Sequence, residues 1–290
     1  MTQVTLSGSR ERQAIVFMLT AILAMSVMDA TVKGLAPRVG VVPALWARYA
    51  GQMLVVTLLI LPRARGVVRT RRPGAQILRS ALLMGATGFF FTSLSLIPLS
   101  EAAALMSVNP VIITLGAALF LGEKLGPRRI VGIAVALLGA FIIIRPGSSV
   151  FSPAALLPLG AACCYSAYAL LTRRIGADED IWTSLFYTGI VGTLVLSALI
   201  PFVWTSLDAT SVVLMLVVAA AGTTGQLFMI RAFSAGEAAM LAPYAYVGLI
   251  LAAMWGLVLY NEVPDLWTVV GAAIISCAGL YVWYRETHRN

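Results

Sequence analysis

Ten long apolar blocks, each nearly free of charged residues, constrain the fold of this chain more than any other feature. They cover residues 14–33, 43–62, 77–98, 102–122, 127–145, 154–173, 181–202, 211–232, 238–259 and 266–284. A helix needs about 20 apolar residues to cross a bilayer. Only 11% of the residues are charged, against roughly 25% in a soluble domain. The chain is therefore predicted to lie in a membrane.

The spanning segments are predicted to be helices. Lipid offers no hydrogen-bond partner to a free backbone group, so only helices and closed barrels cross a bilayer. The sequence lacks the alternating strands of about ten residues that are typical of outer-membrane barrels. The fold class that follows is an all-α membrane protein with ten transmembrane helices. The first block is too long for the apolar region of a signal peptide and has no clear cleavage site, so it is interpreted as a retained helix.

The basic residues indicate the orientation. If the N-terminus is cytoplasmic, 16 of the 20 Lys and Arg residues fall in cytoplasmic segments and three in outer segments, with Arg48 inside a span. This bias follows the positive-inside rule. The tails, residues 1–13 and 285–290, are therefore expected in the cytoplasm. The net charge of +8 reflects this orientation, and we expect no nucleic-acid partner.

The chain repeats itself. GATGFFF begins at Gly85 and GTTGQLF at Gly222, 137 residues later. Glu101 and Glu237 follow with an offset of 136, and Glu123 and Glu262 with an offset of 139. Each copy, residues 14–145 and 154–284, holds five spans. Five is an odd number, so the second copy enters the membrane from the opposite side. Inverted repeats are typical of secondary transporters, whose substrate site lies near mid-bilayer between the repeats.

The paired segments EAAALMSVNPVIITLGAALFLGEKL and EAAMLAPYAYVGLILAAMWGLVLYNEV resemble the two EamA modules of the drug/metabolite transporter superfamily. The stretch from Pro110 to Glu123 is the sharpest part. The second copy departs from the pattern, because Leu249 stands where Pro110 stands in the first and its proline is Pro243. Tyr-Asn also replaces Leu-Gly before Glu262. The resemblance implies metabolite export across a bacterial inner membrane, and the whole sequence is most similar to the aromatic amino-acid exporters.

Two glycine pairs lie near mid-depth in their spans. Gly85 and Gly88 share one helical face, as do Gly222 and Gly225, because the spacing is i, i+3. Small residues let another helix approach closely. The pairs either pack helices together or yield room during a change of access.

Asn109-Pro110 interrupts the fourth span. Proline lacks a backbone N–H and so frees the carbonyl group one turn earlier, at Met106. The segment is either a structural kink or a place that holds the charged end of a substrate. In the ninth span, Pro243 has the comparable role.

The charged residues inside the spans are few. Asp29 is the only acid within any block and stands four residues before Lys33, so the two can pair on one helix face. As functional groups, Asp29 would bind an ammonium group and Lys33 a carboxylate. Arg48 is expected to extend to the membrane interface, with a position facing the cavity as the alternative.

Polar and aromatic side chains near mid-span complete the predicted substrate site. The repeat brings Met25 and Met28 into correspondence with Tyr165 and Tyr168 (offset 140), where sulfur–aromatic contacts are favourable. The other candidates are Phe90, Gln226, Tyr244 and Tyr246. Aromatic residues in a bundle also serve as core or lipid-facing residues.

The function that follows is transport and not catalysis. The single histidine is His288, and no metal-ligand spacing or nucleophile motif occurs, so no cofactor or metal is expected. Cys163, Cys164 and Cys277 are read as small packing residues. We predict an exporter of amino acids, preferably aromatic ones, that works by alternating access as a facilitator. The alternative cargoes are a nucleotide sugar, S-adenosylmethionine or a drug-like cation.

Overall fold

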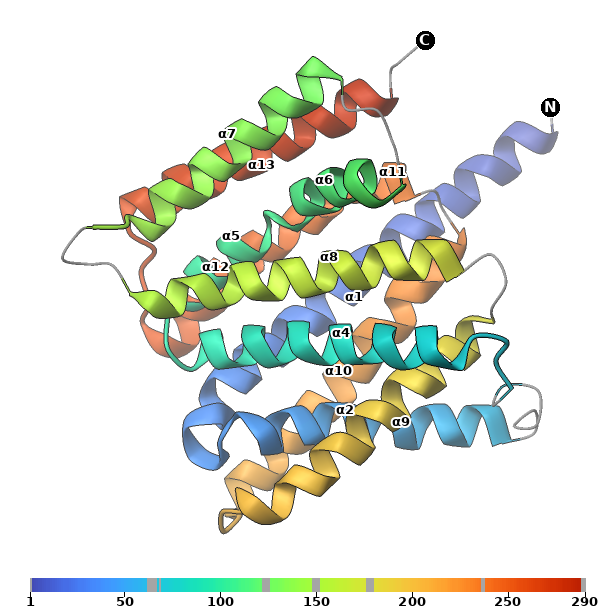
Figure 1. Cartoon of the computed structure of the whole chain (residues 1–290), viewed down its shortest axis with the longest axis vertical. Coiled ribbons are helices and arrows are strands. Elements are labelled where there is room, and N and C mark those ends of the chain that lie inside the picture. Colours follow the sequence, from blue (N-terminus) through green and yellow to red (C-terminus); the bar gives the residue numbers. More distant parts are fainter. Residues whose placement is uncertain are drawn as a thin grey trace.

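All the predicted apolar blocks form helices of one bundle in the computed structural model (Figure 1). The structure describes residues 2–61, 67, 69–121, 126–147, 152–175, 180–235 and 238–287, and no strand occurs among them. Glu123 and Glu237 of the sequence repeat lie outside this part of the chain. Within it, nine helices are long and apolar enough to cross a membrane, and Ile130–Ile144 is a shorter apolar helix. The all-helical, ten-span membrane fold is confirmed.

The first five spans are α1 (Thr2–Val39), α2 (Val41–Ile60), α4 (Pro73–Leu94), the pair α5 (Leu99–Met106) and α6 (Asn109–Leu121), and α7 (Pro127–Ile144). The second five are α8 (Leu156–Ile175), α9 (Ile181–Leu199), α10 (Ala209–Ala235), the broken span α11 (Ala238–Leu241), η4 (Ala242–Tyr246) and α12 (Val247–Tyr260), and α13 (Leu266–Thr287). Short 3₁₀ turns, η2 (Pro153–Ala155) and η3 (Ile200–Phe202), adjoin α8 and α9.

The helix contacts have pseudo-two-fold symmetry, as two inverted five-helix repeats require. Helix α1 packs on α10, and its counterpart α8 packs on α4. In the same way, α2–α10 corresponds to α9–α4, and α1–α12 corresponds to α8–α6. The pairs α7–α13 and α2–α9 each join a helix to its own counterpart. They form the two opposite sides of the bundle, at the top and at the bottom of Figure 1. The two halves are therefore interleaved.

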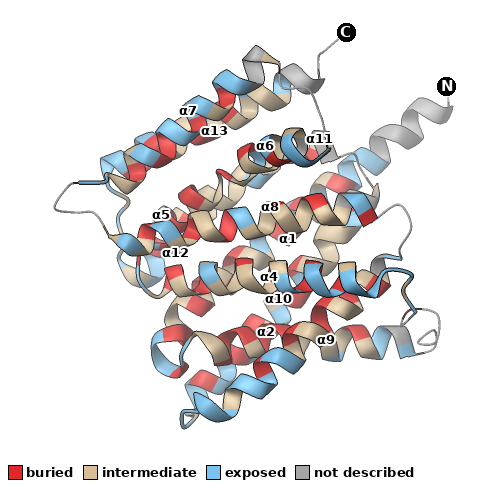
Figure 2. Ribbon diagram, in the orientation of Figure 1, coloured by how far each residue is buried: buried red, intermediate tan, exposed pale blue. Residues whose placement is uncertain are grey.

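The outer surface of the bundle is suited to lipid. Large apolar side chains are exposed all along it, for example Leu119, Phe120, Leu138 and Ile250, and Figure 2 shows exposed residues alternating with buried ones on the same helices. A soluble protein rarely exposes so large an apolar surface. Both termini lie at one end of the bundle (Figure 1), which we call the proximal end. The opposite end, with the α1–α2, α4–α5, α7–α8, α9–α10 and α12–α13 connections, is the distal end.

The fourth and ninth spans are both broken. Helix α5 ends at Met106, and α6 begins again at Asn109 after the turn residues Ser107 and Val108. Pro110 thus sits in the first turn of a new helix, where a missing N–H costs nothing, so the sequence correctly located an interruption that is deeper than a kink. In the ninth span, Pro243 lies in the 3₁₀ segment η4. The two interruptions occupy corresponding places in the repeats.

Two parts of the chain that were expected outside the membrane spans, the N-terminal tail and Arg79, belong to helices. Helix α1 continues back to Thr2, so most of the expected tail, residues 1–13, is part of the first helix; no proline interrupts residues 2–36. Arg79 is one of the 16 basic residues that were assigned to the cytoplasmic segments. It is a buried residue of α4 that donates to the Ser184 carbonyl and the Thr188 hydroxyl of α9. A long-range hydrogen-bond network, which local patterns do not reveal, holds it inside.

The closest approach of α7 and α13 depends on two glycines. A Cβ atom on Gly271 would lie 2.6 Å from the carbonyl oxygen of Gly139, and one on Gly139 would lie 2.9 Å from that of Gly271. Both neighbours are backbone atoms, which cannot move aside as a flexible side chain can. The two helices would have to separate.

We expect Gly271→Ala to destabilise the protein by about 1–3 kcal/mol, the usual cost of overpacking, although alanine is otherwise the better helix former. The measurement is the thermal unfolding midpoint in detergent. Gly74→Ala is the matched control, because a Cβ at Gly74 meets nothing within 4 Å. Equal midpoints for the two variants would contradict the packing assignment.

Candidate functional site

A central cavity of about 320 Å³ lies between the two repeats. It is walled by α1, α2, α4 and α5 of the first half and by α8, α10, η4 and α12 of the second. Its polar lining residues are Ser26, Asp29, Arg48, Thr87, Ser107, Asn109, Tyr165, Tyr168 and Gln226. Most of the remaining lining is apolar, with Met18, Met25, Met28, Met106 and Met229 among it. The cavity is thus an apolar space with a few polar groups, the usual composition of a small-molecule site.

The break in the fourth span opens onto this cavity. Asn109 lines the cavity, and the Ser166 hydroxyl of α8 donates to its amide oxygen over 2.7 Å. That bond uses the acceptor of the Asn109 side chain, so its N–H donors are the groups left for a ligand. On the opposite wall, η4 and α12 contribute Ala245, Gly248 and Leu249. Broken helices at the repeat interface are where transporters of this architecture bind their substrates.

Seven predicted substrate-site residues line the cavity: Met25, Asp29, Phe90, Asn109, Tyr165, Tyr168 and Gln226. Their role in binding stays a prediction. Tyr165 and Tyr168 contact each other, with ring centroids 5.6 Å apart. Lys33 and Tyr244 do not line it, and Tyr244 packs on an apolar cluster of α1, α10 and α11. Tyr246, Pro110 and Pro243 line a second cavity of about 320 Å³ between the broken spans, α7 and α13.

The four repeated glycines differ in their surroundings. A Cβ on Gly225 would lie 2.7 Å from Cγ of Met25, and one on Gly222 would lie 2.9 Å from Sδ of Met28. These two glycines therefore let α10 approach α1 closely. Gly85 and Gly88 are less crowded, since their nearest atoms would be 3.6 Å and 3.9 Å from the added Cβ. Gly222 and Gly225 are therefore needed for the packing of α10 on α1, whereas a larger residue would fit at Gly85 and Gly88 of α4 without a clash of its Cβ atom.

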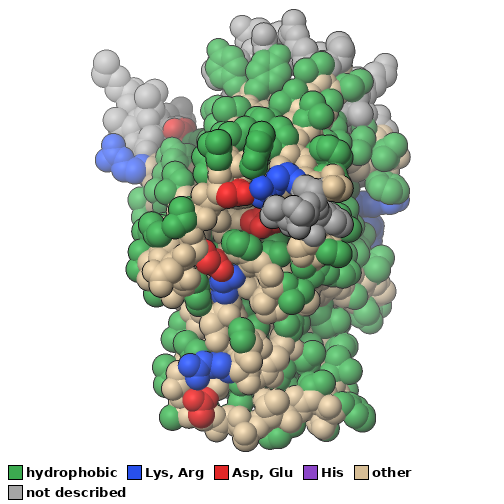
Figure 3. All heavy atoms as spheres, turned by 90° about the vertical axis from the view of Figure 1, so that its left-hand side faces the viewer, with side chains coloured by type: hydrophobic (Ala, Val, Ile, Leu, Met, Phe, Trp, Pro, Cys, Tyr) green, Lys and Arg blue, Asp and Glu red, His purple; other side chains and the backbone are tan. Residues whose placement is uncertain are grey.

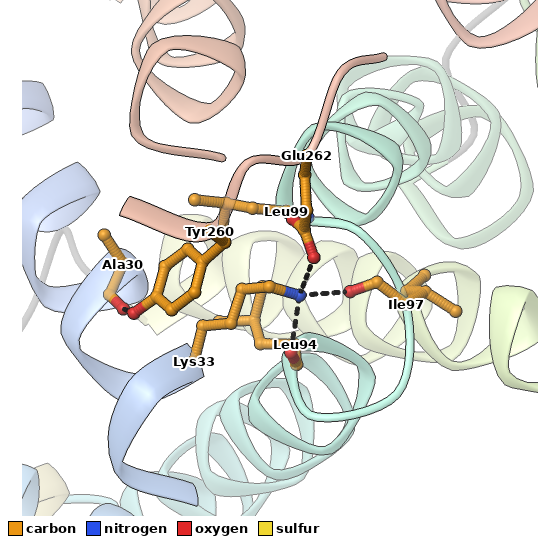
Figure 4. Close-up of polar contacts among 7 residues, drawn as sticks. All are labelled: Ala30, Lys33, Leu94, Ile97, Leu99, Tyr260 and Glu262. Atoms are coloured by element: carbon orange, nitrogen blue, oxygen red, sulfur yellow. Dashed lines mark hydrogen bonds and ion pairs between the residues drawn. The ribbon is translucent and has the colours of Figure 1, made fainter. Parts of the chain in front are cut away.

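Lys33 does not pair with Asp29, and that prediction is wrong. Its ammonium group lies 2.8 Å from the Glu262 carboxylate and donates to the carbonyl groups of Leu94 and Ile97 over 3.2 and 2.8 Å (Figure 4). The other oxygen of Glu262 accepts from the Leu99 backbone N–H over 3.0 Å. These three partners, all outside α1, bind the ammonium group in place of the Asp29 carboxylate, which lies one turn away on the same helix. Lys33 therefore joins the two repeats at the distal end of the bundle.

The turn at the end of α12 brings Glu262 to Lys33. Asn261 ends α12 in the left-handed conformation, with φ 54°, which asparagine tolerates better than most residues. The chain turns there, and the Glu262 N–H bonds the Gly256 carbonyl over 2.9 Å. The Tyr260 hydroxyl donates to the Ala30 carbonyl of α1 over 2.5 Å. Tyr-Asn in place of Leu-Gly thus fastens α12 to α1.

Two further ion pairs join the repeats at the distal end. Arg38 pairs with Asp208 at 3.5 Å, and Arg145 pairs with Asp265. In all three pairs the base belongs to the first repeat and the acid to the second. Figure 3 looks onto this end and shows acidic and basic side chains standing next to one another. We call the three pairs the distal ion pairs.

The carboxylates of the two outermost pairs stay charged over a wide pH range. Hydrogen bonds from Ser211 hold the pKa of Asp208 below its ordinary value of 3.8, and the charge of Arg38 adds to this. Burial raises the pKa of Asp265, but hydrogen bonds from Thr268 and the charge of Arg145 outweigh it and keep the pKa below 3.8. Because the pKa of each carboxyl group is lowered in the folded protein, its contribution to stability is present above pH 3.8 and is lost only as the pH falls below that value.

Arg48 does not extend to the membrane interface as expected. Its residue is 5% exposed and lines the central cavity, and its guanidinium carbon lies 5.2 Å from the Tyr49 ring centroid. Tyr49 and Gln52 beside it on α2 are also buried. Burial on the inward face of α2 prevents the side chain from reaching the interface.

The fold and the cavity define a membrane carrier: two inverted five-helix repeats with a small-molecule site between them. The chain belongs to the EamA-like transporter family, whose model matches residues 12–145 and again 152–284.

Several curated transporters are similar to most of the chain. The pseudopaline exporter CntI of Pseudomonas aeruginosa is 32% identical over 271 residues, which cover 90% of this chain and 93% of that protein. An S-adenosylmethionine uptake transporter of Rickettsia prowazekii is 25% identical, covering 94% and 92%. A riboflavin transporter of Rhizobium johnstonii is 30% identical, covering 77% and 74%. A crystal structure matches with a TM-score of 0.64 at 20% identity, over 95% of this chain and 98% of that one, which supports the fold.

These relatives establish a multi-pass membrane transporter of metabolites. The cargoes in their names differ from one another and are not aromatic amino acids, so the finer resemblance to aromatic amino-acid exporters stays a prediction.

We expect Glu262→Gln to loosen the distal end of the cavity, because Leu99 both lines the cavity and is held by Glu262. Hydrogen bonds to charged groups are worth about 1.5–3 kcal/mol, and the Lys33 and Glu262 side chains are only 11% and 23% exposed. A cysteine at Ala103, in a background without Cys163, Cys164 and Cys277, should react about tenfold faster with an impermeant thiol reagent applied from the distal side.

Asp208→Asn is the control for this measurement. The side chains of its ion pair are 51% and 58% exposed, and exposed pairs contribute about 0–1 kcal/mol, so labelling should change little. The same rate increase in both variants would contradict a specific role for Glu262.

Proposed function

We propose that the protein carries a small zwitterionic metabolite, an amino acid with a large apolar side chain or a close derivative, across a bacterial inner membrane. The observation that supports this most is the central cavity: one acid, one base and two amides sit in a largely apolar lining rich in methionine and aromatic residues. The apolar wall suits a side chain, and the few polar groups suit the charged end. Export is the direction that the family resemblance favours.

The size of the cavity supports a compact cargo. Small-molecule sites span about 300–1,000 Å³, and about 320 Å³ is near the lower limit. A nucleotide sugar would also need several bases around its phosphates. Among the residues that line the cavity, Arg48 is the one lysine or arginine. Both arguments favour an amino-acid-sized zwitterion.

The distal ion pairs support alternating access. All three join one repeat to the other at the distal end, and Leu99 connects the Lys33–Glu262 pair to the cavity wall. From there the cavity extends past Met25 toward Met18 and Met229, in the proximal halves of α1 and α10. A rocking movement that separates the distal ends would break these pairs, and one that closes the proximal half would seal the other side. By the positive-inside rule, the proximal end with both termini faces the cytoplasm.

Facilitated diffusion remains the proposed mode, for a new reason. Asp29 is the one acid inside the predicted spans that could couple transport to protons, and the Asp29–Lys33 pair that would have kept it from this role does not form, because Lys33 pairs with Glu262. Asp29 and Arg48 instead balance each other across the cavity, so a zwitterion enters without changing the total charge and needs no coupling ion. An Asp29→Asn variant that loses uptake driven by a pH gradient, yet keeps counterflow, would contradict this mode.

A second candidate cargo is S-adenosylmethionine. It is an amino acid with a sulfonium cation, and aromatic rings such as Tyr165 and Tyr168 attract cations. Relatives that carry it match nearly the whole chain.

We expect purified protein in liposomes to take up labelled phenylalanine saturably, with weaker or no uptake of a nucleotide sugar and of riboflavin. S-Adenosylmethionine belongs in the same panel, and a preference for it would select the second candidate. Tyr165→Ala should weaken apparent affinity for phenylalanine about tenfold or more, since a buried large apolar side chain contributes about 1.5–3 kcal/mol. Uptake confined to the nucleotide sugar would overturn the proposal.

A further inference from the structure

We propose that Arg48 and Asp29 form the charge-recognition pair of this carrier, with Arg48 binding the carboxylate of the cargo and Asp29 its ammonium group. This assignment rests on the proposed function and narrows it: the cargo is an α-amino acid or a molecule that keeps both charges of one. It replaces Lys33, whose ammonium group is fully engaged by Glu262 and two carbonyl groups at the distal end.

Arg48 has the features of a group that waits for a ligand. Its residue is 95% buried, and its Nε and Nη1 atoms have no hydrogen-bond partner among the described residues. An arginine presents five N–H donors in a planar fork that matches a carboxylate. A buried base normally has its donors satisfied. Arg79, by comparison, donates through both of its Nη atoms, to Thr172, Ser184 and Thr188. The unused donors of Arg48, at the wall of the cavity, fit the carboxylate of a ligand.

Gly222 keeps the space around Arg48 open. A Cβ at this position would lie 3.4 Å from Cγ of Arg48 and 2.9 Å from Sδ of Met28. Any larger residue on α10 would therefore press on the Arg48 side chain. On its other side the ring of Tyr49 lies under the guanidinium group, and the Tyr49 hydroxyl is fixed by Thr87 at 2.9 Å. The side chain is thus positioned by α2, α4 and α10 together.

Asp29 supplies the opposite charge. It lines the same cavity from α1, as Arg48 does from α2. In the part of the chain that the structure describes, no ion pair joins the two residues and no hydrogen bond reaches the Asp29 carboxylate. The two charges therefore face one space without neutralising each other directly.

Charge balance then selects the cargo. An intramembrane site tolerates little net charge. Asp29 and Arg48 sum to zero, and a zwitterion keeps that sum while giving each of them a partner. A simple amine or a simple carboxylate would leave one of the two unpaired and add a net charge. The pair thus discriminates through the electrostatic cost of the wrong cargo as well as through contacts with the right one.

The test compares three ligands of one shape: phenylalanine, 2-phenylethylamine and 3-phenylpropionate. Ligand-induced thermal stabilisation of the purified carrier gives apparent affinities, and liposome uptake of phenylalanine gives activity. Wild type should prefer phenylalanine to both analogues. Arg48→Gln should lose at least tenfold in affinity for phenylalanine and come to prefer the amine. Asp29→Asn should shift the preference toward the carboxylate by a similar factor.

Two controls separate recognition from folding. Arg79→Gln removes a buried arginine that does not line the cavity, so it should lower the unfolding midpoint without changing the ranking of the ligands. Arg48→Lys keeps the charge but not the planar fork, so it should weaken phenylalanine binding less than Arg48→Gln does.

The outcomes are distinct. If wild type binds or transports phenylalanine but Arg48→Gln and Asp29→Asn weaken all three ligands equally, or change none, the charge-recognition pair is wrong while the proposed function stands. If wild type neither binds any of the three ligands nor transports phenylalanine, both fail. Opposite shifts of preference in the two variants support the pair.

Discussion

The absence of water around the bundle is the constraint on which the rest of the structure depends. In lipid, each backbone group and each charge must find its partner inside the protein. Eight of the ten spans meet this condition as uninterrupted helices. The fourth and ninth do not, and their breaks at Ser107–Val108 and at η4 face one central cavity. The repeat places the two breaks at corresponding depths, so one local irregularity, copied and inverted, provides both walls of a site.

The two repeats have diverged in charge, and this gives the bundle unlike ends. At the distal end the first repeat contributes Lys33, Arg38 and Arg145, and the second contributes Glu262, Asp208 and Asp265. A perfectly symmetric duplication could not produce such one-way pairing. Asn261 adopts the left-handed conformation and turns the chain at the end of α12, so that Glu262 reaches Lys33 of α1. Bases at the distal end of α1 and after α7, and acids in the α9–α10 and α12–α13 connections, therefore hold the distal ends together.

The sequence predicted those parts of the fold that depend on local composition and on the repeat. The lengths of the apolar blocks predicted the spans, and the common offset predicted which helices of the two repeats correspond. Pro110 predicted an interruption in the fourth span. Contacts between distant segments were not accessible in this way. Lys33 was paired with Asp29 because they are four residues apart, whereas its partner is 229 residues away along the chain. Arg48 was assigned to the interface because its depth was clear from sequence but the direction of its side chain was not.

The contrast between Lys33 and Arg48 distinguishes structural from functional charges in this bundle. Both are basic side chains at the distal halves of their helices, and both are removed from water. Lys33 has three partners within hydrogen-bond distance, so moving the repeats apart would cost those interactions, which gives the pair a role in closure. Arg48 keeps two nitrogens without partners, so its desolvation is not offset within the described protein. A buried charge without a partner is strongly destabilising, and in the proposed charge-recognition pair the carboxylate of the cargo provides the partner of Arg48.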